Sequence, residues 1–220
     1  MRRPRTTRVL AFAAALPLFV VSAALPAQKR TFEGIITFRG EEGAVIQYYV
    51  GHSRVRAEVS SGDDRGVMIM DPAARTMYML VPAQQMYMEM QLPAPDHAIE
   101  EHAPKMTVTK TGKTEVVAGH RCEYWHIVSS EDNSNTDVCL TTELGNFVLF
   151  NSPMRRSKEP AWERMFGKGD HFPLKVISHN GGKDKTEMEV TNVEPKSLDA
   201  SLFSPPSSYR KMEMPMGAHH

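Results

Sequence analysis

Residues 67–90 read VMIMDPAARTMYMLVPAQQMYMEM and hold seven methionines at alternate positions: Met68, Met70, Met77, Met79, Met86, Met88 and Met90. Alternate residues of a β-strand point to the same side of a sheet. Pro72 and Pro82 each suit the start of a four-residue turn, which would join three short strands. With turns of that length, Met68 faces Met79 and Met79 faces Met88, so the sequence predicts a meander with all seven methionines in rows on one concave face.

Strand-like segments separated by turn residues continue on both sides of this meander. They cover 32–38, 44–50, 54–59, 106–110, 114–117, 122–128, 137–141, 174–178 and 186–193. Many short strands at regular spacing are typical of an all-β meander. Two segments, 94–103 and 160–166, have helical composition. We therefore expect a mainly β (α+β) fold. It has a single curved antiparallel sheet of about ten to eleven strands, with one or two short helices over the concave face.

The face opposite the methionines is also apolar, because it carries Val67, Ile69, Tyr78, Leu80 and Tyr87. Three interpretations of the methionine rows stay open. Flexible thioether side chains fill irregular cores, and they also line pliable cavities for lipid-like ligands. Thioethers bind Cu(I) as well, and the C-terminal tail adds further candidate metal ligands: Met212, Met214, Met216, His219 and His220.

The N-terminus has the layout of a secretory signal peptide. Four arginines (Arg2, Arg3, Arg5 and Arg8) precede an apolar run over 9–21, and small residues follow up to Ala27. The run is shorter than a membrane span requires and contains Pro17. We expect a signal peptide over 1–27, then a single domain over 28–220 with an extended tail from about 198. We expect no transmembrane segment after cleavage. No cysteine lies near the cleavage site to take a lipid, so a soluble periplasmic or extracellular protein is expected rather than a lipoprotein.

Net charge argues against a nucleic-acid partner. The chain has 26 basic and 26 acidic residues, and the predicted signal peptide holds four of the arginines and no acid. The remaining domain is therefore slightly acidic, whereas nucleic-acid-binding domains carry a basic excess or patch.

The two cysteines, Cys122 and Cys139, predict one disulfide bond, because paired cysteines are usual in oxidising compartments. They flank the turn-like residues EDNSN (131–135). A hairpin centred there places Cys122 opposite Cys139, Tyr124 opposite Asp137, and His126 opposite Asn135.

No segment gathers a nucleophile, a base and an orienting group, so we expect no enzyme, no catalytic residue and no cofactor. His97 and His102 are five residues apart and do not match a zinc-binding helix, and the other histidines are scattered.

Four phrases together resemble a bacterial family named only as a domain of unknown function, number 4412. These are GKTEVVAGHRCEYW (112–125), TTELG (141–145), FPLKV (172–176) and LDASLFSPPSSYRKM (198–212). Families of this type resemble the LolA/LolB lipoprotein carriers. That resemblance implies a half-barrel of antiparallel strands that binds lipid, and it implies no catalytic residue.

These observations favour an exported protein that binds a lipid or another apolar ligand in a half-barrel. The methionines of residues 67–90 are its candidate ligand-binding residues. The alternatives are a periplasmic copper-binding protein that uses Met and His, and an envelope protein-interaction domain with a sealed core.

Overall fold

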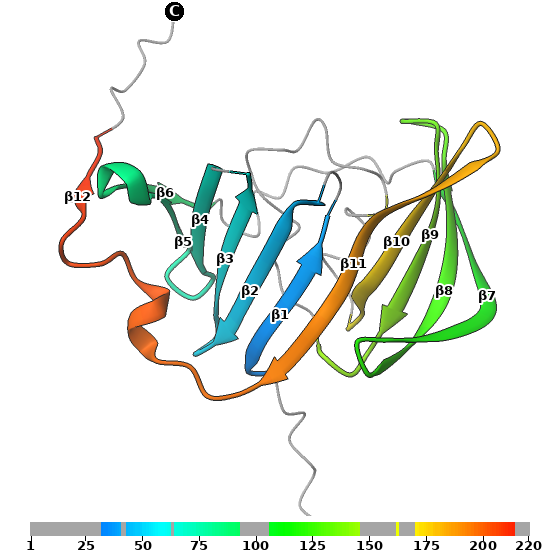
Figure 1. Ribbon diagram of the computed structural model, residues 1–220, viewed down its shortest axis with the longest axis horizontal. Helices are drawn as coiled ribbons and strands as arrows, with labels where there is room; N and C mark the ends of the chain where they lie inside the picture. The colour runs from blue at the N-terminus through cyan, green and yellow to red at the C-terminus, as the bar shows by residue number, and fades with distance from the viewer. Residues whose placement is uncertain are drawn as a thin grey trace, which may run out of the picture. The chain divides into compact units, whose positions relative to one another are not determined.

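The computed structural model of the chain describes residues 32–40, 43–62, 64–92, 106–145, 162 and 170–213. They lie in one compact unit, Thr31–His220, and form a twelve-stranded sheet of order β12-β6-β5-β4-β3-β2-β1-β11-β10-β9-β8-β7 (Figure 1). The strands are β1 Gly34–Arg39, β2 Val45–Gly51, β3 Arg54–Ser61, β4 Asp64–Asp71, β5 Thr76–Val81, β6 Met86–Gln91, β7 Met106–Val117, β8 His120–Ser129, β9 Ser134–Thr141, β10 Phe172–Asn180, β11 Lys183–Pro195 and β12 Arg210–Lys211. Neighbouring strands pair antiparallel except β12, which runs parallel to β6.

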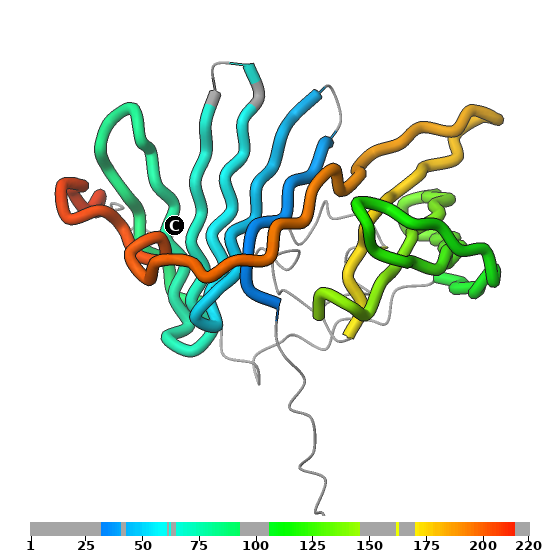
Figure 2. Tube along the Cα trace, turned by 60° about the horizontal axis from the view of Figure 1, so that its bottom comes forward, coloured from blue at the N-terminus to red at the C-terminus, as the bar shows by residue number. Residues whose placement is uncertain are grey.

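The prediction of a mainly β fold with one curved sheet is confirmed (Figure 2). The expected count of about ten to eleven strands is wrong, because the sheet has twelve. The segments 106–110 and 114–117 form one long strand, β7, interrupted by an irregularity at residues 111–113. The C-terminal tail adds β12 at the sheet edge. The predicted helix over 94–103 lies outside the described residues, as does the predicted helix over 160–166 apart from Trp162.

The two turns of the methionine meander have the predicted length. The β4–β5 turn closes with the N–H of Arg75 donating to the carbonyl of Pro72 at 3.3 Å. A 3-10 turn, η2 (Pro82–Gln84), joins β5 to β6 and ends at Gln85, whose φ of 50° is left-handed. Met68 therefore faces Met79, and Met79 faces Met88, as expected. Since each strand alternates, all seven methionines share one face of the sheet.

This methionine face is the inner face of the curved sheet. By register it continues through Ala57 on β3, Tyr48 on β2 and Ile36 on β1. These residues belong to a buried cluster that also includes Cys122 and Tyr124 on β8, although five strands lie between β3 and β8. Side chains from such distant strands meet only on the inside of a curved sheet.

The outer face of β4 and β5 is covered by the chain's own C-terminal segment. A 3-10 turn, η5 (Ala200–Phe203), is capped by Asp199, whose carboxylate accepts a hydrogen bond from the N–H of Ser201 at 2.8 Å. Leu198 and Phe203 are buried there against Ile69 and neighbouring apolar residues. The predicted extended tail thus contains a turn and a strand, because it has an apolar surface to cover. In the described part of the chain, no helix has the length and hydropathy needed to cross a bilayer.

Candidate functional site

The methionine face is buried at one end of its rows and partly open at the other. Met70 and Met77 are buried, with 2% and 0% of their surface exposed. The other five methionines, Met68, Met79, Met86, Met88 and Met90, are only partly buried. Four of these five lie on β5 and β6. Thioether side chains there can repack around an apolar group that settles on the sheet.

The C-terminal tail begins beside this part of the sheet. The N–H of Met212 donates to the carbonyl of Tyr87 on β6 at 2.7 Å, immediately after the parallel pairing of β12 with β6. Met214, Met216, His219 and His220 lie outside the described residues. The structure therefore places one candidate copper ligand of the tail, Met212, next to the methionine-bearing strand β6.

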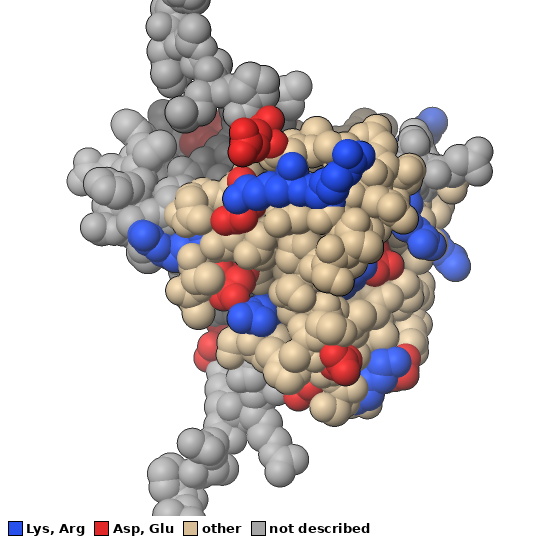
Figure 3. Space-filling view, turned by 90° about the vertical axis from the view of Figure 1, so that its left-hand side faces the viewer, with Lys and Arg blue, Asp and Glu red and all other residues tan. Residues whose placement is uncertain are grey.

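Figure 3 shows the side of the molecule where β6 and β12 form the sheet edge. Lys and Arg side chains on this side are interspersed with Asp and Glu and with uncharged residues, and some basic side chains lie directly beside an acidic one. One such pair joins Lys211 to Glu89 at 2.7 Å. The described residues of this side therefore carry charges of both signs.

The predicted disulfide is present, with the Cα atoms of Cys122 and Cys139 5.3 Å apart. The predicted register of its hairpin is wrong by two residues. Cys139 faces Tyr124, so the crosslink runs diagonally between β8 and β9. The cause is the turn, which spans 130–133 and ends at Asn133 with a left-handed φ of 52°. Asp132 stabilises that turn by accepting a hydrogen bond from the N–H of Ser134 at 3.2 Å.

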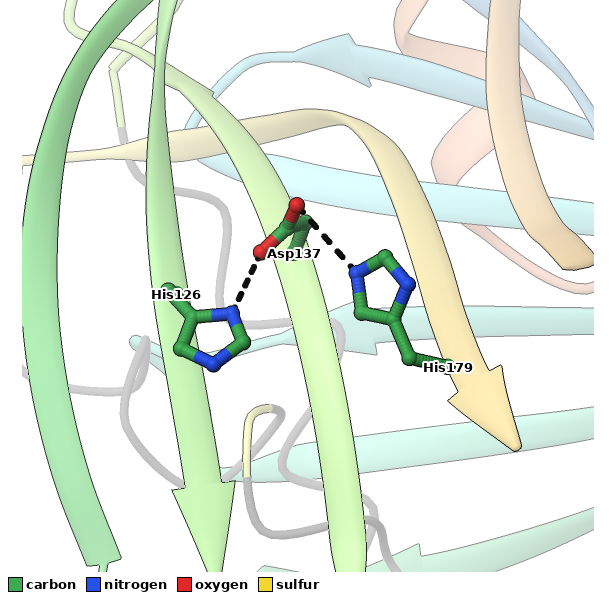
Figure 4. A group of neighbouring side chains, drawn as sticks. All are labelled: His126, Asp137 and His179. Carbon is green, nitrogen blue, oxygen red and sulfur yellow. Dashed lines mark hydrogen bonds and ion pairs between the residues drawn. The ribbon is translucent and has the colours of Figure 1, made fainter. Parts of the chain in front are cut away.

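The corrected register brings together a group of side chains that the sequence did not reveal. His126 faces Asp137, and its Nδ1 lies 2.7 Å from Asp137 Oδ1. His179 on β10 approaches the same carboxylate from the other side, with Nε2 3.2 Å from Asp137 Oδ2 (Figure 4). Nδ1 of His179 lies 2.7 Å from Oδ1 of Asp184, its partner on β11. A His–Asp–His–Asp row thus crosses four adjacent strands.

The row is polar and partly open to solvent. The exposed fractions are 37% for His126, 25% for Asp137, 25% for His179 and 74% for Asp184. The hydrogen bond to Asp184 raises the pKa of His179 above its ordinary value, and Asp137 adds to the effect against opposing burial. The ligand atoms of His126, Asp137 and His179 all lie within 4.8 Å of one another.

The same face of β8 and β9 carries a second polar group close to the disulfide. The Tyr124 hydroxyl donates to Glu115, and this bond holds the pKa of Glu115 below its ordinary value. Lys175 Nζ lies 3.3 Å from Glu115 and 3.4 Å from Glu189. These groups pair with each other, so they act as a structural network that connects β7, β8, β10 and β11.

A shallow cavity of about 350 Å³ opens beside the disulfide. The rings of Trp125 and His171, which line it, lie against each other at a tilt, with centroids 4.9 Å apart. Arg121, Glu123 and Glu143 also line it. Charges of both signs in the lining make this cavity a poorer candidate for an apolar ligand than the methionine face.

Sequence reasoning missed the His–Asp–His row because it centred the hairpin turn one residue too early, which shifts the pairing by two. The available signal was Asp132–Asn133, since Asn tolerates a left-handed conformation and Asp caps the residue two positions on. A turn ending at Asn133 would have set His126 opposite Asp137. The contribution of His179 depends on the neighbouring strand and had no local signal.

Comparisons with known proteins identify a family but no activity. A family described as "Domain of unknown function (DUF4412)" matches residues 32–209. The chain is similar to a solved structure, an uncharacterized conserved protein from Thermus thermophilus. The two share 10% identity and a TM-score of 0.47, with 81% of this chain and 87% of that chain covered. No curated protein matches the sequence.

Proposed function

The chain belongs to the DUF4412 family, and for this member we propose an exported protein that binds an apolar ligand, such as an acyl chain, along the methionine face. The observation that carries the proposal is the register of β4, β5 and β6. It places seven methionines on the inner face of the sheet, and five of them are partly exposed. Rows of flexible thioethers suit a ligand whose shape varies.

The two faces of the meander differ in a way that supports this proposal. On the outer face, Phe203 and Leu198 of the chain's own C-terminal segment cover β4 and β5. On the inner face, Met79 and Met88 stand directly opposite each other and are partly open. Full burial of an apolar side chain stabilises by roughly 1.5–3 kcal/mol, so an acyl chain lying over several methionines would gain several kcal/mol.

The disulfide supports export to an oxidising compartment, because such bonds rarely persist where thiols are kept reduced. The N-terminal sequence supports the same location through its arginines and apolar run. The resemblance to lipoprotein carriers favours lipid among apolar ligands. We infer a binding role rather than catalysis, since His126, Asp137 and His179 pair with one another and no nucleophile is grouped with them among the described residues.

The proposal is tested by binding of a fluorescent fatty acid to the full chain. Met79→Glu with Met88→Glu places two carboxylates on the inner face, and we expect binding to fall at least tenfold. Val116→Glu is the control. Val116 is 67% exposed on β7, so this substitution adds a carboxylate to the surface away from the methionines. Equal binding by the double variant and the control would remove the methionine face as the site.

Copper binding is the second candidate, and the position of Met212 beside β6 favours it. Cu(I) prefers thioether ligands. Titration with Cu(I) against a competing chelator distinguishes the two functions. A copper protein would bind one or more ions tightly and lose that affinity when Met212, Met214 and Met216 are replaced by leucine. A lipid-binding protein would retain fatty-acid binding in that variant.

A further inference from the structure

We propose that His126, Asp137 and His179 form a binding site for a divalent transition-metal ion of the zinc type, with Asp184 as the outer partner of His179. The three ligand residues come from β8, β9 and β10, which are adjacent in the sheet. Imidazole and carboxylate are ligands that Zn²⁺ accepts, and sites with three protein ligands leave a fourth position for water.

The distances are close to those of a metal site. With bonds of about 2.0–2.1 Å in tetrahedral geometry, ligand atoms lie about 3.4 Å apart. Asp137 oxygens are 2.7 Å from His126 Nδ1 and 3.2 Å from His179 Nε2. The ligand atoms of the three residues are within 4.8 Å of one another. The distance between any two ligand atoms therefore has to shorten by at most about 1.4 Å to match a tetrahedral site. Rotation of the two imidazole side chains can provide this change.

Asp184 is the feature that separates this group from an ordinary surface ion pair. Metal-binding histidines usually donate their second ring N–H to a carboxylate, which fixes the tautomer and directs the other nitrogen at the metal. Asp184 Oδ1 lies 2.7 Å from Nδ1 of His179, and Nε2 of the same ring points at Asp137. The sheet thus orients His179 with Nε2 available as the ligand.

Charge and access also fit a divalent cation. Asp137 and Asp184 supply two negative charges, which balance the ion when both imidazoles are neutral. The three ligand residues are 25–37% exposed, so an ion and a water molecule can reach them.

The disulfide holds this site in register. Cys122 and His126 lie on the same side of β8, and Asp137 and Cys139 lie on the same side of β9. A two-residue slip of the hairpin would place His126 opposite Asn135 or Cys139 and break the ligand set. The crosslink between Cys122 and Cys139 opposes such a slip.

The test is Zn²⁺ titration of the full chain by calorimetry, in a parent variant with His219→Ala and His220→Ala so that the tail cannot contribute. We expect the parent to bind one Zn²⁺, and both His179→Gln and Asp137→Asn to weaken binding more than a hundredfold. Asp184→Asn should weaken it tenfold to a hundredfold, as outer partners do.

His120→Gln is the matched control, because His120 is also on β8 and its Nδ1 lies 2.7 Å from a carboxylate oxygen of Glu143. We expect its Zn²⁺ affinity to equal that of the parent. Circular dichroism confirms the fold of each variant, and His126→Gln replaces any variant that does not fold. Absence of Zn²⁺ binding in the parent, or equal binding by the parent and by His179→Gln, would overturn the proposal.

Discussion

Removal of the disulfide tests the constraint that fixes the β8–β9 hairpin. Both cysteines are buried, with 2% and 0% of their surface exposed, so Cys122→Ala with Cys139→Ala keeps the site apolar. The crosslinked residues are 17 apart in sequence. The loop-closure entropy of a chain segment of that length corresponds to about 3 kcal/mol at 25 °C. We therefore expect the free energy of unfolding to fall by about 3 kcal/mol.

Urea unfolding of three samples measures this loss: the oxidised protein, the reduced protein and the double alanine variant. The reduced protein and the variant should unfold at similar midpoints, well below that of the oxidised protein. Reductant should leave the variant unchanged, because it has no disulfide to reduce. A loss below about 1 kcal/mol would show that the unfolded chain gains little freedom without the crosslink, and that the disulfide does not stabilise the fold by loop closure.

Three further substitutions test particular contacts. Burial opposes ionisation of Asp71, but the Ala74 N–H and the Arg54 guanidinium, 2.6 Å away, hold its pKa below the ordinary value. This carboxylate stabilises the fold above about pH 4, and the contribution is lost as the pH falls through the folded pKa. The stability of Asp71→Asn should therefore fall less steeply below pH ~4 than that of the wild-type protein. Urea unfolding at several pH values measures this difference. Phe203→Ala should lower the free energy of unfolding by about 3–5 kcal/mol in thermal unfolding, because it removes a fully buried ring. A decrease of less than about 1 kcal/mol would show that the C-terminal segment does not seal the outer face. Gly34→Ala should destabilise by more than about 1 kcal/mol, because a Cβ there would lie 2.2 Å from the carbonyl oxygen of Glu194. Gly66→Ala is the control, because a Cβ added at Gly66 would meet open space. This substitution should leave the free energy of unfolding nearly unchanged.

The strands and the methionine register followed from local information. In β4, β5 and β6, strict alternation and two four-residue turns were enough to pair Met68 with Met79 and Met79 with Met88. The turn lengths decided the outcome, and Pro72 and Pro82 marked the start of each turn.

Features that depend on distant segments were missed. The short strand β12 forms because Arg210 and Lys211 reach the open edge of β6, and no local pattern in two residues predicts that pairing. The His126–Asp137–His179 group needed both the correct turn at 130–133 and the neighbouring strand β10. An error of two residues in the register of one hairpin therefore hid the candidate metal site while leaving the disulfide prediction intact.

Native mass spectrometry of the full chain, purified from the envelope of the cells that produce it, detects directly whether the protein carries a lipid. If the methionine face binds an acyl chain, a fraction of the protein carries an additional mass equal to a fatty acid or a phospholipid. The Met79→Glu, Met88→Glu double variant should lose this mass, and the Val116→Glu control should keep it. A wild-type spectrum that shows only the bare chain, under conditions in which a known lipid carrier stays loaded, would mean that the protein does not hold a lipid on this face.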